Sequence, residues 1–533
     1  MKTLLKNGKI VDGTGAEPYF ADVLIEDDRI LEIASKIEAP VDNHIDCSGL
    51  VVAPGFIDCH SHNDWYAARP DNLRFYTPFL EQGITTQVTG NCGFSPFGFD
   101  KQTPHLPLLG SGLFTLGDIE DDTSSLPAFA AAVKSLPLNL VPLYGHMSGR
   151  ISISGYDSRA LTEPELEQLD ALIEQTFRDG AAGLSFGLMY EPDRYAPYDE
   201  LKRAAALCAK HGKILTIHGR ANSAASTSYN PPIGGRAHNL RALDELARLA
   251  RETGAKIQHS HLIFVGEKSW KTADESLEIV RQLNEEGLDF KYDSYSLTYG
   301  TSVITVVLPA WYLTLPKEKR SGRLARLRLG LEIGLTKRVL GFDFRDIVIT
   351  WLAEGQDALI GKTVAEIAAD WGVSHLDAYI KLIELSDGRG RVLMRKYLTN
   401  EILLKLMRDV NCLFMTDAWV EEEGMQNPAC FLCFPQFFKV ARENGFALKD
   451  IVHRMTGMAA ERFAIQERGL IKTGYYADLT VFDEKTIGPS SEDGGRPVGI
   501  HLVLINGKTA VRGGAFTGEN NAGLLLLQKE DER

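Results

Sequence analysis

Eight short apolar runs, separated by longer stretches with a helical pattern, fill the middle of the chain and limit the folds open to it. The runs cover 51–60, 84–91, 138–146, 181–188, 213–219, 255–262, 288–295 and 411–417. Strand-like runs that alternate with helices indicate βα units around a parallel sheet. Eight such units are enough to close a barrel. The sequence therefore predicts an α/β fold, a (β/α)8 TIM barrel.

The two ends of the chain have a different pattern, that of short β-strands. Apolar and polar residues alternate over the first fifty residues, and Asn506-Gly507 near the other end is a strong hairpin signal. We expect the termini to meet in one small β-sandwich domain, residues 1–54 and 465–533. The barrel domain would then span 55–464.

The seventh and eighth apolar runs are separated by residues 296–410, too many for one crossover helix. This segment is predicted to be a mostly helical insertion in the barrel domain, placed where a lid could lie. Its basic stretch, 317–338, spaces Lys and Arg among Leu residues. We interpret that stretch as the solvated face of a helix.

Net charge and hydropathy argue against two classes of partner. The chain has 71 acidic and 57 basic side chains and a formal net charge of -14, and such a field repels phosphate backbones and anionic membrane surfaces. It also lacks a run of about 18 apolar residues. We therefore expect neither a nucleic-acid nor a membrane partner. The seven cysteines are odd in number and scattered, which favours reduced thiols in the cytoplasm over disulfides.

Residues that bind metals or transfer protons recur at the ends of the apolar runs. They are His60 and His62 at the first run, Cys92 after the second, His218 in the fifth, His261 in the sixth and Asp417 in the eighth. Strand ends of this barrel type converge on one mouth, where active sites lie. Sulfur together with imidazole suits Zn²⁺. The pattern predicts a metal site in the mouth, with Asp417 as a proton shuttle.

Each of these residues also has an ordinary explanation when taken alone. Paired histidines are often buried and hydrogen-bonded, and a single cysteine is usually a small buried side chain. Asp417 could simply cap the following helix. The shared position at strand ends favours the metal site over these alternatives.

The same residues lie in motifs by which the chain resembles the amidohydrolase superfamily and, within it, the N-acyl-D-amino-acid deacylase (D-aminoacylase) family. The motifs are APGFIDCHSHND, the GNCG loop, GLMYEP, HGR, QHSHL and, near the end, MTGMAAERF and RGLIKTGYYADLTVFD. The resemblance runs over nearly the whole chain. It implies a hydrolase acting on carbon–nitrogen bonds other than peptide bonds, with a small-molecule amide as substrate.

The resemblance also assigns roles to the site residues. Cys92, His218 and His261 would hold a tightly bound Zn²⁺ ion, and His60 and His62 would belong to a second, weaker position. Asp417 would be the catalytic acid/base, taking a proton from a water that the metal acidifies and returning it to the departing amine.

The chain departs from the family pattern at two positions. Ile263 stands where the family has a lysine after the sixth strand, and Asn427-Pro428-Ala429 replaces the family's HPR after the eighth. Both missing residues are cations that would bind a substrate carboxylate. We therefore expect a less acidic and more apolar substrate than N-acyl-D-amino acids.

Four further residues are candidates for substrate contact. Tyr190 and Tyr295 match two family tyrosines that the resemblance places near the substrate. Arg220 or Arg236 could replace the missing cations.

Three other functions stay open at this point. Ser185 lies in a GLSFG match to the GxSxG elbow of serine hydrolases, although GLMYEP after it is a poor helix start. A cyclic-amide hydrolase of the hydantoinase or dihydroorotase type would share the barrel, but the fourth run has no lysine to bridge two metals. The chain could also be a non-catalytic metal-binding scaffold. A homo-oligomer is compatible with the sequence, which does not fix the oligomeric state.

Overall fold

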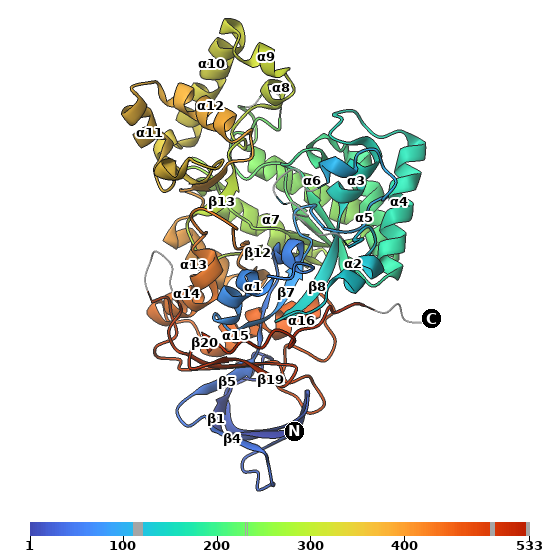
Figure 1. Cartoon of the computed structure of the whole chain (residues 1–533), viewed down its shortest axis with the longest axis vertical. Helices are drawn as coiled ribbons and strands as arrows, with labels where there is room; N and C mark the ends of the chain where they lie inside the picture. Colours follow the sequence, from blue (N-terminus) through green and yellow to red (C-terminus); the bar gives the residue numbers. More distant parts are fainter. Residues whose placement is uncertain (110–113, 115–120, 230, 232, 491–495, 529–533) are drawn as a thin grey trace.

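Parallel strands form a nearly closed barrel at the centre of the molecule (Figure 1). The computed structural model describes residues 1–109, 114, 121–229, 231, 233–490 and 496–528, and within this part the barrel has eight strands. They are β6 (Phe56–Asp58), β7 (Ile84–Thr89), β8 (Asn139–Gly145), β9 (Gly183–Gly187), β10 (Ile214–His218), β11 (Lys256–His259), β12 (Phe290–Ser294) and β16 (Cys412–Phe414). Each strand pairs with the next one in this order. The predicted TIM barrel is confirmed.

The first and last barrel strands meet just beyond their carboxyl ends. The amide of Asp417 donates to the carbonyl oxygen of His60 at 3.1 Å. Asp58, buried in β6, accepts two hydrogen bonds from Thr416, one from its amide at 2.9 Å and one from its hydroxyl at 2.6 Å. These contacts bring residues from distant parts of the chain to one place in the barrel mouth.

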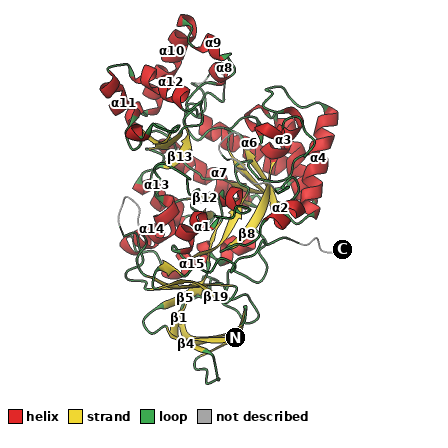
Figure 2. Cartoon of the chain, viewed as in Figure 1, coloured by secondary structure: helices red, strands yellow, loops and turns green. Residues whose placement is uncertain are grey.

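Helices cover the outside of the barrel (Figure 2). They are α1 (Leu73–Leu80), α2 (Leu126–Ala132), α3 (His146–Ser154), α4 (Glu163–Arg178), α5 (Tyr198–Lys210), α6 (His238–Thr253), α7 (Ala273–Glu285), α13 (Asn400–Arg408), α14 (Ala429–Glu443), α15 (Leu448–Met455) and α16 (Gly457–Arg462). Helix α4 shows how the sequence sets their ends. A capping box between Thr162 and Glu165 starts it, and Gly180, with a φ of 108°, follows its end.

Strands from both ends of the chain join in one sheet at the amino-terminal side of the barrel. In the described residues this sheet has nine strands. They are β1 (Lys2–Ile10), β2 (Tyr19–Glu26), β3 (Arg29–Ala34), β4 (Asn43–Asp46), β5 (Val51–Pro54), β17 (Leu479–Phe482), β18 (Ile500–Ile505), β19 (Lys508–Arg512) and β20 (Ala515–Phe516). The two halves meet where β5 pairs with β17. The termini therefore associate as expected, but as one continuous hydrogen-bonded sheet.

The first apolar run of the sequence is divided between the two sheets. Its first part, β5, lies in the terminal sheet, and its second part, β6, is the first barrel strand. Gly55 forms the junction, because a Cβ there would lie 2.2 Å from the hydroxyl oxygen of Thr85. A glycine is needed where the chain crosses this close to β7.

The insertion between β12 and β16 lies over the carboxyl ends of the barrel strands, at the top of Figure 1. Its helices are α8 (Ala310–Leu313), α9 (Lys317–Arg320), α10 (Arg323–Leu340), α11 (Val364–Trp371) and α12 (His375–Leu385). It also contains an antiparallel sheet of the described strands β13 (Gly300–Val303), β15 (Arg391–Met394) and β14 (Ile347–Trp351). The helical prediction is correct in the main. It missed the sheet, whose short strands are separated by long helical segments.

Helix α10 differs from the expected solvated face in one respect. Its basic residues are accompanied at the surface by leucines. Leu324, Leu327, Leu331 and Leu335 are exposed by 84%, 63%, 67% and 50%. Leu329 and Ile333, on the opposite side, are buried. The helix therefore packs by a narrow stripe and leaves an apolar face in solvent.

The remaining expectations concern cysteines, membranes and boundaries. All seven cysteines are buried free thiols, as expected, including Cys430 and Cys433 in α14. Among the described helices, none has the length and apolar character that a membrane crossing requires. The expected domain limits stay predictions, and 491–495 and 529–533, within the expected terminal domain, lie outside the described residues.

Candidate metal centre

Six side chains predicted from strand ends come together in the barrel mouth. His60 and His62 follow β6, Cys92 follows β7, His218 ends β10, and His261 and Asp417 lie just past β11 and β16. All six residues lie in the buried interior or at its edge: the five donors other than Asp417 are at most 4% exposed, and the Asp417 side chain is 19% exposed. The mouth is therefore enclosed and rich in sulfur, nitrogen and carboxylate donors.

Cys92 is at the centre of the cluster. Its Sγ atom lies 3.3 Å from Nε2 of His60, 3.6 Å from Nδ1 of His218 and 3.7 Å from Nε2 of His261. Donor atoms around a tetrahedral zinc ion are about 3.3 to 3.8 Å apart, given ligand bonds of about 2.0 to 2.3 Å. The separations in the cluster therefore fit a shared metal ion.

Asp417 lies beside the same cluster, next to the two histidines that follow β6. Its Oδ1 atom lies 3.4 Å from Nε2 of His60 and 3.6 Å from Nε2 of His62. Two groups of three donors result, one of His60, Cys92 and His261 and one of His60, His62 and Asp417. His60 belongs to both groups. The first group differs from the expected tight position, since it pairs Cys92 and His261 with His60, whereas the resemblance paired them with His218 and placed His60 in the weaker position.

The backbone at three of these residues is in the left-handed region. The φ angles are 53° at Cys92, 35° at His261 and 48° at Asp417, and ten non-glycine residues in the described chain have positive φ. Such conformations are uncommon for residues with a Cβ and concentrate at functional sites. The fold therefore maintains strained backbone at three residues of the donor cluster.

The charge states suit a metal site. Burial alone would raise the pKa of the Cys92 thiol, but His60 and His261 hold it well below its ordinary value. Burial likewise opposes ionisation of Asp417, yet the imidazoles of His261, His62 and His60 hold its pKa below the usual range. The surrounding imidazoles therefore favour the anionic form of both groups, the form in which they bind metals or accept protons.

Buried residues behind the cluster fix its orientation. Asp293 in β12 accepts a 2.6 Å hydrogen bond from the amide of His261 and lies 3.7 Å from Nδ1 of His60. Asn222 places its amide nitrogen 3.3 Å from Nε2 of His218. Hydrogen bonds of this kind, made to the ring nitrogen or backbone of a ligand residue, hold ligand rings in position. Neither residue was predicted from the sequence, where the only indication of a role was a polar side chain near the end of a strand.

Ser185 holds the loop that carries Cys92. Its hydroxyl donates to the carbonyl oxygen of Gly90 at 2.5 Å and accepts from the amide of Gly93 at 2.9 Å. The residue lies inside strand β9 and is fully buried. A nucleophile elbow needs a serine exposed on a strand-to-helix turn. The serine-hydrolase alternative is therefore not favoured.

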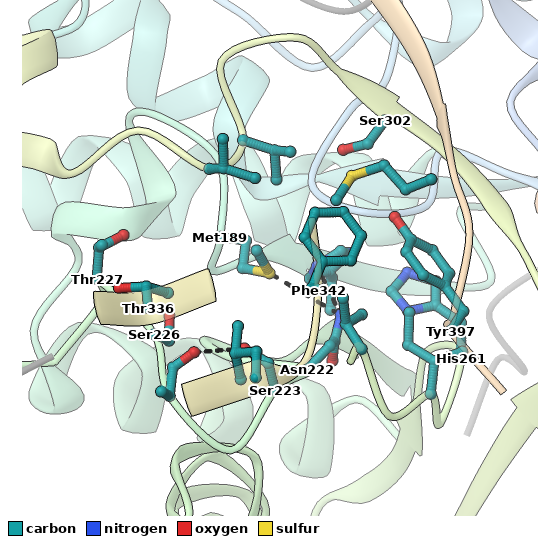
Figure 3. Close-up of a pocket in the computed structure, with 18 of the residues that line it drawn as sticks. Met189, Asn222, Ser223, Ser226, Thr227, His261, Ser302, Thr336, Phe342 and Tyr397 are labelled. Atoms are coloured by element: carbon teal, nitrogen blue, oxygen red, sulfur yellow. Dashed lines mark hydrogen bonds between the residues drawn. The ribbon is translucent and has the colours of Figure 1, made fainter. Parts of the chain in front are cut away.

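A cavity with a volume of about 110 Å³ opens from the donor cluster (Figure 3). His218, His261 and Asp417 lie in its wall. Its other described residues are apolar or uncharged polar, among them Met189, Asn222, Ile263, Ser302, Phe342 and Tyr397. The insertion supplies much of this wall. A substrate that reaches the donors would contact both the barrel and the insertion.

The four residues expected to contact substrate are placed differently from one another. Tyr190 lines the cavity, and its ring lies 4.8 Å from that of His218. Tyr295 is buried and is not part of the cavity wall among the described residues. Arg220 binds Glu245 at 2.9 Å and two backbone carbonyls. Arg236 pairs with two surface carboxylates. The two arginines are thus engaged away from the cavity.

Comparison with known proteins is consistent with this geometry. A model of the amidohydrolase family matches residues 51–289 and 394–510. A D-aminoacylase of Alcaligenes xylosoxydans xylosoxydans is 29% identical, covering 98% of this chain and 97% of its own. An N-acyl-D-glutamate deacylase from Bordetella bronchiseptica, solved with zinc and a phosphonate inhibitor, superposes with a TM-score of 0.78 at 25% identity, covering 98% and 99% of the two chains.

A third relative carries information about metals. A D-aminoacylase structure, described as having a binuclear metal center with one-metal activation and second-metal attenuation, gives a TM-score of 0.79 at 26% identity over 99% of each chain. The family model covers more than half of this chain, and both of its segments contain residues of the donor cluster. The chain belongs to the amidohydrolase family.

Proposed function

We propose that the protein is a zinc-dependent hydrolase that cleaves an N-acyl amide bond, similar in activity to the D-aminoacylases. The observation that carries the proposal is the cluster around Cys92, with donor separations of 3.3 to 3.7 Å. The names of the relatives support the reaction class, since they are a D-aminoacylase and N-acyl-D-aspartate and N-acyl-D-glutamate deacylases. A non-catalytic scaffold or a cyclic-amide hydrolase is not favoured by these relatives.

Two positions for metal are part of the proposal. Cys92, His218 and His261 would hold the tightly bound ion, because sulfur and imidazole are its preferred ligands. His60 and His62, with Asp417 beside them, would form the weaker position. His60 lies closest to Cys92 of the three histidines that contact its sulfur, so it would connect the two positions.

The chain's own residues would carry the proton and position the substrate. A bound zinc ion supplies an acidified water and a polarised carbonyl. Asp417, anionic and at the cluster, would accept the proton of that water and pass it to the amine nitrogen as the amide breaks. Tyr190 keeps its proton, because burial raises the pKa of its phenol well above the ordinary value. It can therefore donate a hydrogen bond to the developing oxyanion.

The substrate should be uncharged next to the amide. No Lys or Arg belongs to the described wall of the cavity that contains Asp417. Ile263 is in this wall and is buried, at the position where the family's lysine would be. An α-carboxylate there would lose its hydration without gaining a cation. A less acidic and more apolar amide fits this environment better. We also propose a cytoplasmic location, which the free thiols support.

Metal analysis combined with an amide screen tests the proposal. Purified protein should contain zinc, lose activity on chelation and recover it on adding zinc back. N-acyl alkylamines should be hydrolysed faster than N-acyl-D-amino acids. Full activity in metal-free protein, or no hydrolysis of any amide by zinc-loaded protein, would contradict the function. A strong preference for N-acyl-D-α-amino acids would contradict the substrate assignment alone.

A further inference from the structure

A second cavity, with a volume of about 300 Å³, opens beside the first on the side of the insertion. The two cavities share Met189, Tyr190 and Val306 in their walls. Met189 is labelled at the first cavity in Figure 3. Tyr190 also contacts His218, so the junction lies next to the donor cluster. One arm of a substrate held at the donors could therefore extend past Tyr190 into the second cavity.

The two cavities differ in charge. The described wall of the first contains no Lys or Arg. The described wall of the second contains four arginines and two carboxylates, namely Arg194, Arg320, Arg389 and Arg391 with Glu191 and Asp387. Three of the arginines come from the insertion and Arg194 from the short helix after β9 (Asp193–Tyr195). Cations thus gather at this cavity although the whole chain has a net charge of -14.

Arg194 and Arg320 have capacity left for a ligand. Arg194 is half-buried and gives one hydrogen bond, of 3.1 Å, to the hydroxyl of Thr227. Arg320 is held by the backbone carbonyls of Leu313 and Leu315. Neither guanidinium has a carboxylate within 4.0 Å among the described residues. A guanidinium has five N–H donors, so each can still receive an anion.

Arg389 and Arg391 bring further positive charge together. Arg391 is buried and lies 3.6 Å from a carboxylate oxygen of Glu421. Arg389 is exposed, and its guanidinium makes no ion pair with a described residue. Burial lowers the pKa of Arg391, and the nearby charge of Arg389 lowers it further. Like charges that face one cavity are stabilised when an anion lies between them.

We propose that the second cavity is a subsite for a carboxylate at the end of the substrate remote from the scissile amide. Arg194 and Arg389 would bind it directly, and Arg320 would contribute charge from α9. The inference rests on the proposed function, because the carboxylate belongs to the amide cleaved at the donor cluster. It refines the substrate class to an amide that is uncharged beside the scissile bond and anionic at its far end.

A series of substrates that differ in the distance between the amide and the carboxylate tests the subsite. N-acetyl aminoalkanoates, with one to seven methylenes between the amide nitrogen and the carboxylate, are compared with N-acetyl alkylamines of the same length in zinc-loaded protein. Among the carboxylates, we expect the shortest to have the lowest kcat/KM. At longer spacings, kcat/KM for each carboxylate should exceed that for the neutral amide of the same length by about 10-fold or more. An advantage confined to the shortest member, or absent at every spacing, would overturn the subsite.

Substitutions assign the effect to the arginines. Arg389→Ala and Arg194→Gln should each remove most of the advantage of the carboxylate and change kcat/KM for the neutral amides less than about 2-fold. Arg389→Lys should keep part of the advantage of the carboxylate, because the positive charge remains while the bidentate hydrogen bonding is lost. Arg236→Ala is the matched control, because Arg236 is a surface arginine paired with Asp244 and Glu275.

Outcomes separate this inference from the proposed function. If neutral amides are hydrolysed and carboxylates gain nothing, the subsite is wrong and the function stands. If no amide is hydrolysed by zinc-loaded protein, the function is wrong. In that case binding of the longer aminoalkanoates is measured by calorimetry, and binding unaffected by Arg389→Ala overturns the subsite as well.

Discussion

The barrel mouth and the insertion contribute different things to one site. The mouth supplies every donor in the cluster, and all six of these residues lie within the two segments that the family model matches. The insertion lies almost wholly between those segments, yet it supplies Ser302, Leu340 and Phe342 to the cavity wall. The mouth thus contains the groups for the shared chemistry. The insertion adds uncharged side chains to the wall of the cavity that opens from them.

The largest effect is expected from removing the central donor of the mouth. Cys92→Ala takes away the sulfur that contacts three histidines, so zinc binding should be lost and turnover should fall by at least about 10³-fold. Metal content of the purified variant and its turnover with added zinc are the measurements. Cys208→Ala, a buried thiol in α5, is the control and should retain zinc. A Cys92→Ala protein with parental zinc content would remove Cys92 from the metal site.

Asp417→Asn tests whether the mouth separates metal binding from proton transfer. The amide keeps the size of the side chain but cannot accept a proton, so turnover should fall by about 10²- to 10⁴-fold while the zinc of the tight position remains. Asp357→Asn, on the insertion, serves as the control. Turnover equal to that of the parent would exclude Asp417 as the acid/base.

Ile263→Lys would change selectivity while leaving the chemistry in place. A cation in the wall of the first cavity should raise kcat/KM for N-acyl-D-α-amino acids relative to neutral amides by about 10-fold. Ile263→Leu preserves the apolar character and should leave that ratio unchanged. The ratio is measured with zinc-loaded proteins on paired substrates. A ratio that does not move in Ile263→Lys would mean that α-substituents do not reach this wall.

The residues of the mouth could be predicted because a simple rule places them. Parallel strands of a barrel end at one rim, so His60, Cys92 and Asp417 were expected to meet although they are far apart in the sequence. Asp293 could not be predicted in this way. Its role depends on an amide of His261 that reaches it across neighbouring strands. The left-handed backbone at Cys92 was likewise invisible in a sequence where Asn91 precedes it and Gly93 follows it.

The insertion was harder to predict because no repeated rule governs it. Its antiparallel sheet unites strands as far apart as Gly300 and Met394, and each strand is too short to give a clear alternating pattern. The expected role of Arg220 could not be judged either, since its partner Glu245 approaches from α6 and occupies the guanidinium. Residue type alone does not show which cations are already paired.

Ser185→Ala tests how much the Ser185 hydroxyl stabilises the loop that carries Cys92. Losing the hydroxyl leaves a buried carbonyl at Gly90 and a buried amide at Gly93 without their partner, which should lower the free energy of unfolding by about 1 to 3 kcal/mol. Turnover should stay within about 10-fold of the parent, because the serine supports the loop and does not attack the substrate. Urea unfolding and turnover are measured together. Complete loss of turnover with zinc retained would revive the serine nucleophile.

The smallest change in stability is expected from substitutions on the exposed face of α10. This prediction extends the comparison between the packed mouth and the solvated insertion. Leu331 is 67% exposed and Leu329 fully buried in the same helix. Leu331→Ala should therefore change the free energy of unfolding by less than about 0.5 kcal/mol, whereas Leu329→Ala leaves a cavity that lowers it by about 2 to 5 kcal/mol. Chemical denaturation compares the two variants. Equal losses in the free energy of unfolding would show that the leucine face of α10 is covered in solution, as it would be in a homo-oligomer. Sedimentation of the two variants would then show whether a second copy of the chain covers it.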